Sequence, residues 1–369
     1  MSADLGWGRE VFAFALALQN LMWGVFQPFA GAIADKWGAG RVVMVGGLLY
    51  ALGLHGMATA ADPTALQLNA GVLIGLAQSG AGLSVALGAV ARTVPAERRS
   101  WALGVVTAAG SLGQVVVAPL GQAFLEAYGW SAALMLLGLS ALLIAPLGAV
   151  LRGRAETPAA ADSQSLVAAL AEARRHRGFL LLTSGFFVCG FHVAFIAVHL
   201  PAFLVDGGLP AEVGAWALAL IGLANVAGSY ASGVLGGRFS KKYLLSGLYL
   251  ARAALFLLFI ALPLSTASAL GFAAVLGLLW LSTVPLTSGL VAQIFGPRYL
   301  ATLFGIVFFS HQLGSFIGVW LGGYLYDVTG SYLGVWWTGV ALGVAAAVIH
   351  WPIDDRPVAR LAEARQVSG

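Results

Sequence analysis

Long apolar runs alternate with short polar connections along nearly the whole chain. A helix that crosses a bilayer needs about 20 mostly apolar residues. By this criterion the chain holds eleven candidate spans, near residues 11–34, 42–61, 66–91, 100–126, 130–151, 178–205, 212–237, 243–263, 268–295, 299–326 and 331–351. The runs are continuous, whereas a membrane strand would alternate apolar and polar residues over about ten positions. The pattern therefore predicts an all-α, multi-pass integral membrane protein.

The composition agrees with this prediction, because 60% of the 369 residues are hydrophobic and 9% are charged. A soluble domain carries about 25% charged residues. The single cysteine, Cys189, excludes an internal disulfide and a Cys-rich metal site. The histidines are scattered, and no phosphate-binding loop of the type G-x-x-x-x-G-K-S/T is present. We therefore expect no enzyme activity, no cofactor, no metal and no direct use of ATP.

Apart from Arg9 in the N-terminal segment and Arg252 within a span, the lysines and arginines fall in alternate connections between the predicted spans or in the tail. These residues are Lys36, Arg41, Arg92, Arg98, Arg99, Arg152, Arg154, Arg174, Arg175, Arg177, Arg238, Lys241, Lys242 and Arg298, with Arg356, Arg360 and Arg365 in the tail. By the positive-inside rule these connections and the C-terminus are cytoplasmic, in the inner or plasma membrane of a cell. The net charge of +4 is thus a sign of topology, and no nucleic-acid partner is expected.

The two halves of the chain match each other at a shift of 202 residues. Gly31, in G-A-I-A-D-K-W-G-A-G-R, falls on Gly233, in G-V-L-G-G-R-F-S-K-K. Asp4, Gly6 and Glu10 fall on Asp206, Gly208 and Glu212. A parallel repeat of two membrane halves is a known transporter architecture.

The repeat predicts two pseudo-symmetric helix bundles, at residues 1–151 and 178–351. A cytoplasmic linker at 152–177, with an amphipathic helix near its end, and a cytoplasmic tail at 352–369 complete the chain. The span at 178–205 has no first-half counterpart, which would precede Met1. The eleven spans therefore correspond to helices two to twelve of twelve, with a first helix absent through a start-site error or a real truncation.

The segment Gly31-A-I-A-Asp35-Lys36-W-Gly38-A-G-Arg41 resembles the signature loop of the major facilitator superfamily. A second segment resembles the helix-five motif common among its exporters and exchangers: Gly110, Gly113, Pro119 and Gly121. The stretches LGWGREVFAFALAL and FFVCGFHVAFIAVHLPAFLVDGGL look like the bacterial monocarboxylate-transporter-like group, whose relatives include the oxalate:formate exchangers.

This resemblance implies a monomeric secondary transporter that works by alternating access. The implied substrate is a small organic anion, most simply a monocarboxylate, with a proton as a candidate coupling ion. One alternative is an exporter of amphipathic drugs or other small solutes with the same fold. A non-transporting receptor or an inactive truncated fragment is an alternative of a different class.

The chemistry of the resembled group carries over only in part. Monocarboxylate carriers place an aspartate and an arginine on helix eight, where this chain has Asn225 and Ser229. The oxalate exchangers place a lysine on helix eleven, where this chain has His311. The carboxylate through which such carriers usually couple to protons therefore has no counterpart at this position.

Arg252 is the only charge in the middle of a predicted span, roughly 15 Å deep at 1.5 Å per residue. A guanidinium at this depth can bind a carboxylate bidentately and so select an anion. The alternative is an arginine that hydrogen-bonds carbonyls of neighbouring helices. The other candidate substrate-binding residues are polar side chains within spans, with interhelical hydrogen bonding as the alternative role: His192, His199, His311, Gln312, Asn225 and Gln78.

Asp35 is predicted to end a helix on the cytoplasmic side. There it can accept hydrogen bonds from helix N-terminal amides and from bases such as Arg92 or Arg41. Such contacts would exist only while this side is closed and would favour the outward-facing state; the alternative is a simple topology anchor. The full set of candidate gating residues is Gly31, Asp35, Lys36, Gly38, Arg41, Arg92, Gly110, Gly113, Pro119, Gly121, Gly233 and Arg238.

Overall fold

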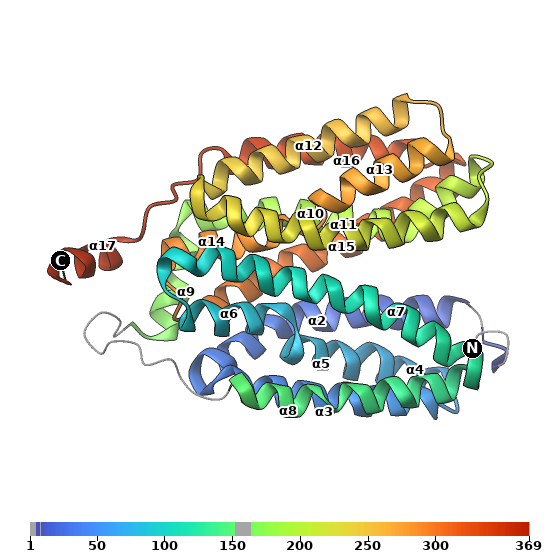
Figure 1. Cartoon of the computed structure of the whole chain (residues 1–369), viewed down its shortest axis with the longest axis horizontal. Helices are drawn as coiled ribbons and strands as arrows, with labels where there is room; N and C mark the ends of the chain where they lie inside the picture. Colours follow the sequence, from blue (N-terminus) through green and yellow to red (C-terminus); the bar gives the residue numbers. More distant parts are fainter. Residues whose placement is uncertain (1–4, 8, 152–163, 369) are drawn as a thin grey trace. The chain divides into compact units, whose positions relative to one another are not determined.

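The computed structural model describes residues 5–7, 9–151 and 164–368. Within these residues the regular structure is entirely helical, which confirms the all-α prediction (Figure 1). Asp4, Arg152 and Arg154, and with them the start of the predicted linker, lie outside the described residues.

The chain divides into two compact units, the first of which holds the described parts of 1–93, 116–162 and 298–309. Its helices are α2 (Arg9–Trp37), α3 (Ala39–Ala58), α4 (Pro63–Leu66), the π-helical η1 (Gln67–Leu73), α5 (Ile74–Ala81), α6 (Leu83–Thr93), the later part of α7 (Ala96–Ala141), α8 (Ile144–Gly148), the 3-10 segment η2 (Ala149–Leu151) and the start of α15 (Leu300–Thr329). Small side chains dominate its core around α2, α3 and α6, which brings these helices close together.

The second unit holds the first part of α7, the described residues from 163 to 297, and residues 310–369 as far as they are described. Its further helices are α9 (Leu166–Arg175), α10 (Arg177–Asp206), α11 (Ala211–Arg238), α12 (Lys241–Ala261), α13 (Thr266–Leu279), α14 (Thr283–Phe295), the remainder of α15, α16 (Leu333–His350) and α17 (Ala359–Ser368). Helices α12, α13 and α16 run side by side (Figure 1). Their core is aromatic: Trp336 is fully buried against the rings of Phe195, Phe256 and Phe259.

Nine helical stretches in the described part are long and apolar enough to cross a membrane. Two of the eleven predicted spans, 100–126 and 130–151, fall within one of these stretches, Ala96–Leu151. They are separated there by Gly129, whose φ of 76° lies in the left-handed region that favours glycine. The first predicted span corresponds to α2, which is not among the nine.

The predicted amphipathic helix before the second bundle is confirmed as α9. It begins where the Ser165 hydroxyl accepts a hydrogen bond from the Ala168 N–H, an N-cap that satisfies a free donor of the first turn. Two arginines lie in its last turn, where positive charge interacts favourably with the helix dipole.

Each half contains one predicted span that is a broken helix. In the first half α5 and α6 are separated at Gly82, which adopts an extended backbone with ψ of 174°. In the second half α13 ends at Leu279 and α14 begins at Thr283. Pro285 gives a reason for this break, because proline lacks an N–H and its ring clashes with the carbonyl four residues earlier. The repeat thus extends to the helix interruptions.

Candidate functional site

A stripe of four residues along α2 faces the beginning of α15. Trp23, Gln27, Gly31 and Asp35 are spaced by four, so they lie on one face of the helix. The Trp23 ring lies 4.9 Å from the ring of Phe308, between centroids. The contacts of this stripe therefore run from the interior of α15 to its first turn.

Asp35 is the polar end of the stripe, and its side chain is fully buried. Its Oδ2 accepts hydrogen bonds from the backbone N–H of Thr302 at 2.8 Å and from the Thr302 hydroxyl at 2.7 Å. Its Oδ1 forms an ion pair with Arg92, in the last turn of α6. The carboxylate thereby joins α2 and α6 to the N-terminal turn of α15, where a negative charge is favoured by the helix dipole. We call Asp35, Arg92 and Thr302 the latch.

The backbones of three helices approach each other next to the latch. A Cβ atom added at Gly31 would overlap the backbone of Ala301, and one added at Gly88 would lie 2.7 Å from the Ala301 Cβ. Only glycine therefore permits α2 and α6 to approach α15 this closely.

A matching crossing exists at Gly233, the residue that the repeat pairs with Gly31. A Cβ atom added at Gly104 of α7 would lie 2.6 Å from the Gly233 Cα of α11. The repeat pairs Asp35 with Gly237, so this second crossing has glycine where the first has its carboxylate. The two crossings share close backbone packing and differ in charge.

Replacing Gly104 with leucine should destabilise the protein, because the added side chain must displace the α11 backbone, at a cost of about 1–3 kcal/mol. Gly110→Leu on the same helix is the matched control, since a Cβ at Gly110 meets no atom within 4 Å. We expect the midpoint of thermal unfolding in detergent, followed by tryptophan fluorescence, to fall for Gly104→Leu and to stay near wild type for Gly110→Leu. Equal shifts would show that the crossing is not tight in solution.

Arg252 lies on α12 with 1% of its surface exposed. Its Nε donates a hydrogen bond to the Leu279 carbonyl at 3.2 Å, and its Nη2 donates to the carbonyls of Leu279 and Trp280. Its Nη1 is buried and has no hydrogen-bond partner among the described residues. The guanidinium lies over the Tyr249 ring, with its Cζ 5.5 Å from the ring centroid. The structure thus gives Arg252 the carbonyl contacts of the alternative interpretation and leaves the two N–H donors of Nη1 unused.

Asn225 is completely buried at a meeting point of three elements. Its Nδ2 donates a hydrogen bond to the hydroxyl of Ser111 on α7 at 2.8 Å. Its Oδ1 accepts from the N–H of Leu281 at 2.9 Å and from the Ser229 hydroxyl at 3.1 Å. Asn225 therefore connects α11 with α7 and with the break between α13 and α14.

The candidate histidines contact neighbouring helices. His192 donates a hydrogen bond from Nε2 to the Gly339 carbonyl on α16 at 2.8 Å, and His199 donates from Nε2 to the Val319 carbonyl on α15 at 2.9 Å. His311 is buried, and its Nδ1 donates to the Gln312 Oε1 at 3.2 Å. The substrate-binding role of these residues remains a prediction.

Gln78 lies on α5. It accepts a hydrogen bond from Gln19 on α2 at 3.0 Å, in the first unit, whereas the other candidate substrate residues lie in the second. Within the second unit, the structure brings Asn225 and Arg252 to one helix break.

The remaining gating candidates lie apart from both crossings or at their edges. Gly38 turns the chain between α2 and α3 with φ of 99°. The Lys36 Nζ lies 4.7 Å from the centroid of the Trp37 ring. Exposed positions are Arg41, Arg238, Gly110, Gly113 and Pro119, while Gly121 is half-buried. A Cβ atom at Gly113 would meet no atom within 4 Å.

Four contact residues were not singled out from the sequence: Trp23, Gln27, Ser111 and Thr302. The spacing of four back from Gly31 could have indicated Gln27 and Trp23. Thr302 and Ser111 carry no comparable signal, because a single hydroxyl in an apolar run most often bonds within its own helix.

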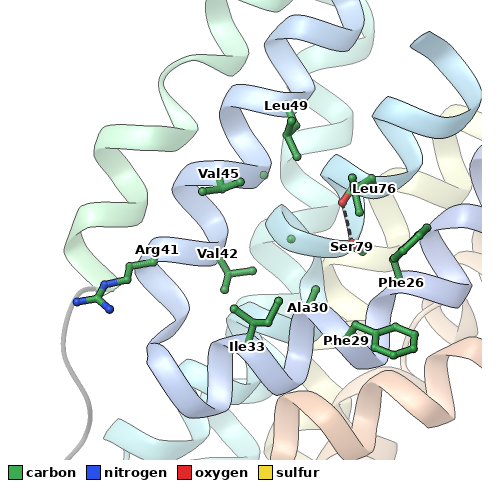
Figure 2. Close-up of a pocket in the computed structure, with 12 residues that line it drawn as sticks. Phe26, Phe29, Ala30, Ile33, Arg41, Val42, Val45, Leu49, Leu76 and Ser79 are labelled. Atoms are coloured by element: carbon green, nitrogen blue, oxygen red, sulfur yellow. Dashed lines mark hydrogen bonds between the residues drawn. The ribbon is translucent and has the colours of Figure 1, made fainter. Parts of the chain in front are cut away.

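A mostly apolar pocket of about 320 Å³ lies between α2, α3 and α5 in the first unit. Figure 2 shows Phe26, Phe29 and Ile33 on one side, Val45 and Leu49 on another, and Arg41 at the edge. No candidate substrate-binding residue lines this pocket. Its lining is apolar apart from Arg41 and Ser79.

Comparison with known proteins identifies the family of this chain. The model of a family described as the Major Facilitator Superfamily matches residues 1–319. The chain belongs to the major facilitator superfamily. The resemblance seen in the signature loop is therefore confirmed, and with it a multi-pass membrane transporter fold.

Among curated proteins, this superfamily member is 30% identical over 339 residues to monocarboxylate transporter 11 of Mus musculus, covering 89% of this chain and 73% of the relative. It is 28% identical over 315 residues to monocarboxylate transporter 13 of Bos taurus, covering 82% and 71%. Among solved structures, the E. coli fucose:proton symporter superposes with a TM-score of 0.73 at 18% identity, covering 93% of this chain and 91% of the symporter. The last similarity concerns the fold alone.

Proposed function

We propose that this transporter moves a small organic anion, most simply a monocarboxylate, across the inner or plasma membrane. The observation that carries the proposal is that the guanidinium of Arg252 is buried without a counter-charge among the described residues. A buried charge is costly unless a counter-charge and hydrogen bonds compensate it. Among the described residues Arg252 forms no ion pair, and its Nη1 has no acceptor. A substrate carboxylate bound at Nη1 would supply both, and this interaction would be charge-assisted.

The relatives support the same substrate class. The two curated relatives described above carry the name monocarboxylate transporter. Their similarity extends over most of this chain, including the helices that carry Arg252 and Asn225. We infer a monomeric carrier with a cytoplasmic C-terminus, and we retain the proton as a candidate coupling ion.

We propose further that the protein works by alternating access and that the latch holds one side closed. The latch joins the end of α2 to the beginning of α15, next to connections that the positive-inside rule places in the cytoplasm. Separation of α15 from α2 would break two hydrogen bonds to a carboxylate, so the latch favours the state in which these helices touch.

Counterflow in proteoliposomes tests the substrate class directly. Purified protein is reconstituted, vesicles are loaded with one unlabelled compound, and entry of its labelled form is followed. We expect short monocarboxylates to give counterflow and hydrophobic cations to give none. Protein-free vesicles are the control. Counterflow of hydrophobic cations alone would favour a drug exporter, and its absence with every compound would favour a non-transporting protein.

A further inference from the structure

The break between α13 and α14 leaves backbone groups free inside the second unit. In a continuous helix these groups would bond to each other, and in a membrane protein no bulk water replaces the lost bonds. The N–H of Trp280 instead turns back to the Gly277 carbonyl at 3.1 Å, and the N–H of Val284 bonds to the Leu281 carbonyl at 2.9 Å. The carbonyls between these two tightened turns need other donors.

Side chains supply these donors. The Ser282 hydroxyl donates to the Leu278 carbonyl at 2.6 Å. Arg252 donates to the carbonyls of both Leu279 and Trp280. The positive guanidinium also lies at the C-terminal end of α13, where the helix dipole is negative. Arg252 therefore caps a helix that ends within the protein interior.

Asn225 holds the opposite side of the break. Its Oδ1 accepts from the N–H of Leu281, and its Nδ2 donates to Ser111 on α7. The α11 backbone comes close enough for these bonds because residue 228 is a glycine. A Cβ atom added there would overlap the Leu278 backbone. The same side chain thus contacts the break and a helix from the first half of the sequence.

The repeat shows a related arrangement in the first half. The shift of 202 pairs Asn225 and Ser229 with Trp23 and Gln27. Gln27 donates from Nε2 to the carbonyl of Ser79 at 3.0 Å, just before the break at Gly82. In each half a polar side chain, Gln27 of α2 or Asn225 of α11, therefore bonds the backbone beside a helix break, from positions that lie one helical turn apart in the repeat.

We propose that Arg252 and Asn225 are positioning residues that clamp the α13–α14 break, and that this break is a hinge in transport. Asn225 links the hinge to the α7–α11 crossing, because separation of α7 from α11 removes its bond to Ser111. Arg252 clamps through Nε and Nη2 and keeps Nη1 for another ligand. The clamp requires no substrate, so it stands independently of the proposed anion specificity.

The protein carries its own reporter of this hinge. Cys189 on α10 is fully buried, and its Sγ lies 3.1 Å from the hydroxyl oxygen of Thr283, the first residue of α14. It is the single cysteine of the chain. Movement of the start of α14 away from α10 would expose the thiol, and no background cysteine would react.

The experiment is the rate of N-ethylmaleimide labelling of Cys189 in proteoliposomes without substrate, read by mass spectrometry. The wild type should react slowly. Asn225→Leu and Arg252→Met should each react about tenfold faster or more, because each removes hydrogen bonds to buried backbone groups. Ser111→Ala should give a smaller increase, because it leaves the bond between Asn225 and Leu281 in place.

Ser246→Ala is the control for general loosening. Ser246 is a buried residue of α12 whose hydroxyl donates to the Ala347 carbonyl at 2.8 Å, away from the break. Cys189 in the Ser246→Ala variant should be labelled at the wild-type rate. The proposal is overturned if the Asn225 and Arg252 variants label at the wild-type rate, or if Ser246→Ala accelerates labelling equally.

Size-exclusion elution in detergent identifies any variant that fails to fold. If Arg252→Met fails to fold, the labelling rate of Arg252→Lys is measured in its place. A lysine keeps the charge but lacks the planar fork of donors, so it should hold one carbonyl and label at an intermediate rate. Labelling of a folded Arg252→Lys variant at the wild-type rate would contradict the clamp.

Discussion

Arg252→Ala should reduce uptake of the transported acid by more than about 100-fold, since breaking a buried charge interaction costs about 3–5 kcal/mol and 1.4 kcal/mol is tenfold. The reason is that Arg252 is the only buried arginine among the residues whose side chains are described. Uptake into proteoliposomes, normalised to the amount of reconstituted protein, measures this effect. Arg174→Ala on α9 is the control, because Arg174 is exposed and should tolerate the change.

Substrate binding separates the two roles given to Arg252. A bound substrate stabilises a protein and raises its unfolding temperature. We expect this shift to disappear in Arg252→Ala and to persist in Asn225→Leu, which loosens the hinge but keeps the guanidinium. Retained uptake in Arg252→Ala would refute the anion-binding role. Loss of the shift in Asn225→Leu alone would place the substrate at the amide instead.

Asp35→Asn should lower the maximal transport rate about tenfold or more and change the substrate KM by less than about threefold. Each hydrogen bond to a charged group contributes about 1.5–3 kcal/mol, and asparagine removes the charge that Arg92 and the first turn of α15 stabilise. Initial rates of uptake over a range of substrate concentrations measure both parameters.

Asp62→Asn provides a matched control. Asp62 is exposed and caps the first turn of α4, where its side chain accepts from the Ala65 N–H. Asparagine is an equally good N-cap, so the rate should not change. Lost substrate binding in a folded Asp35→Asn protein would show that Asp35 acts at the substrate site and not as a latch.

The latch shows which part of the site was predictable. The sequence places Asp35 at the end of a span, and it indicated Arg92 and the amides of a helix N-terminus as partners. The actual amide belongs to Thr302, 267 residues away along the chain. Nothing local to either segment selects this partner, because it depends on which helix ends meet in the folded protein.

At the break between α13 and α14, too, the sequence predicts one part of the arrangement and the folded structure decides the rest. Pro285 marks a weak point in an otherwise continuous apolar run. The sequence is compatible with two roles for Arg252, anion binding and hydrogen bonding to carbonyls, and carries no signal that identifies the carbonyls. The structure identifies those of Leu279 and Trp280 and adds Asn225 on the other side.

By itself, the sequence determined the all-α class, the multi-pass membrane character and the superfamily, because each follows from hydrophobic run length or from residues at fixed local spacing. Only the tertiary structure decided that Asp35 meets Thr302, that Gly104 meets Gly233, and that Arg252 and Asn225 hold one helix break. Apolar runs make every helix a suitable neighbour for every other. The specific pairs are set by helix rotation and by close approach at small residues, and these are properties of the assembled bundle.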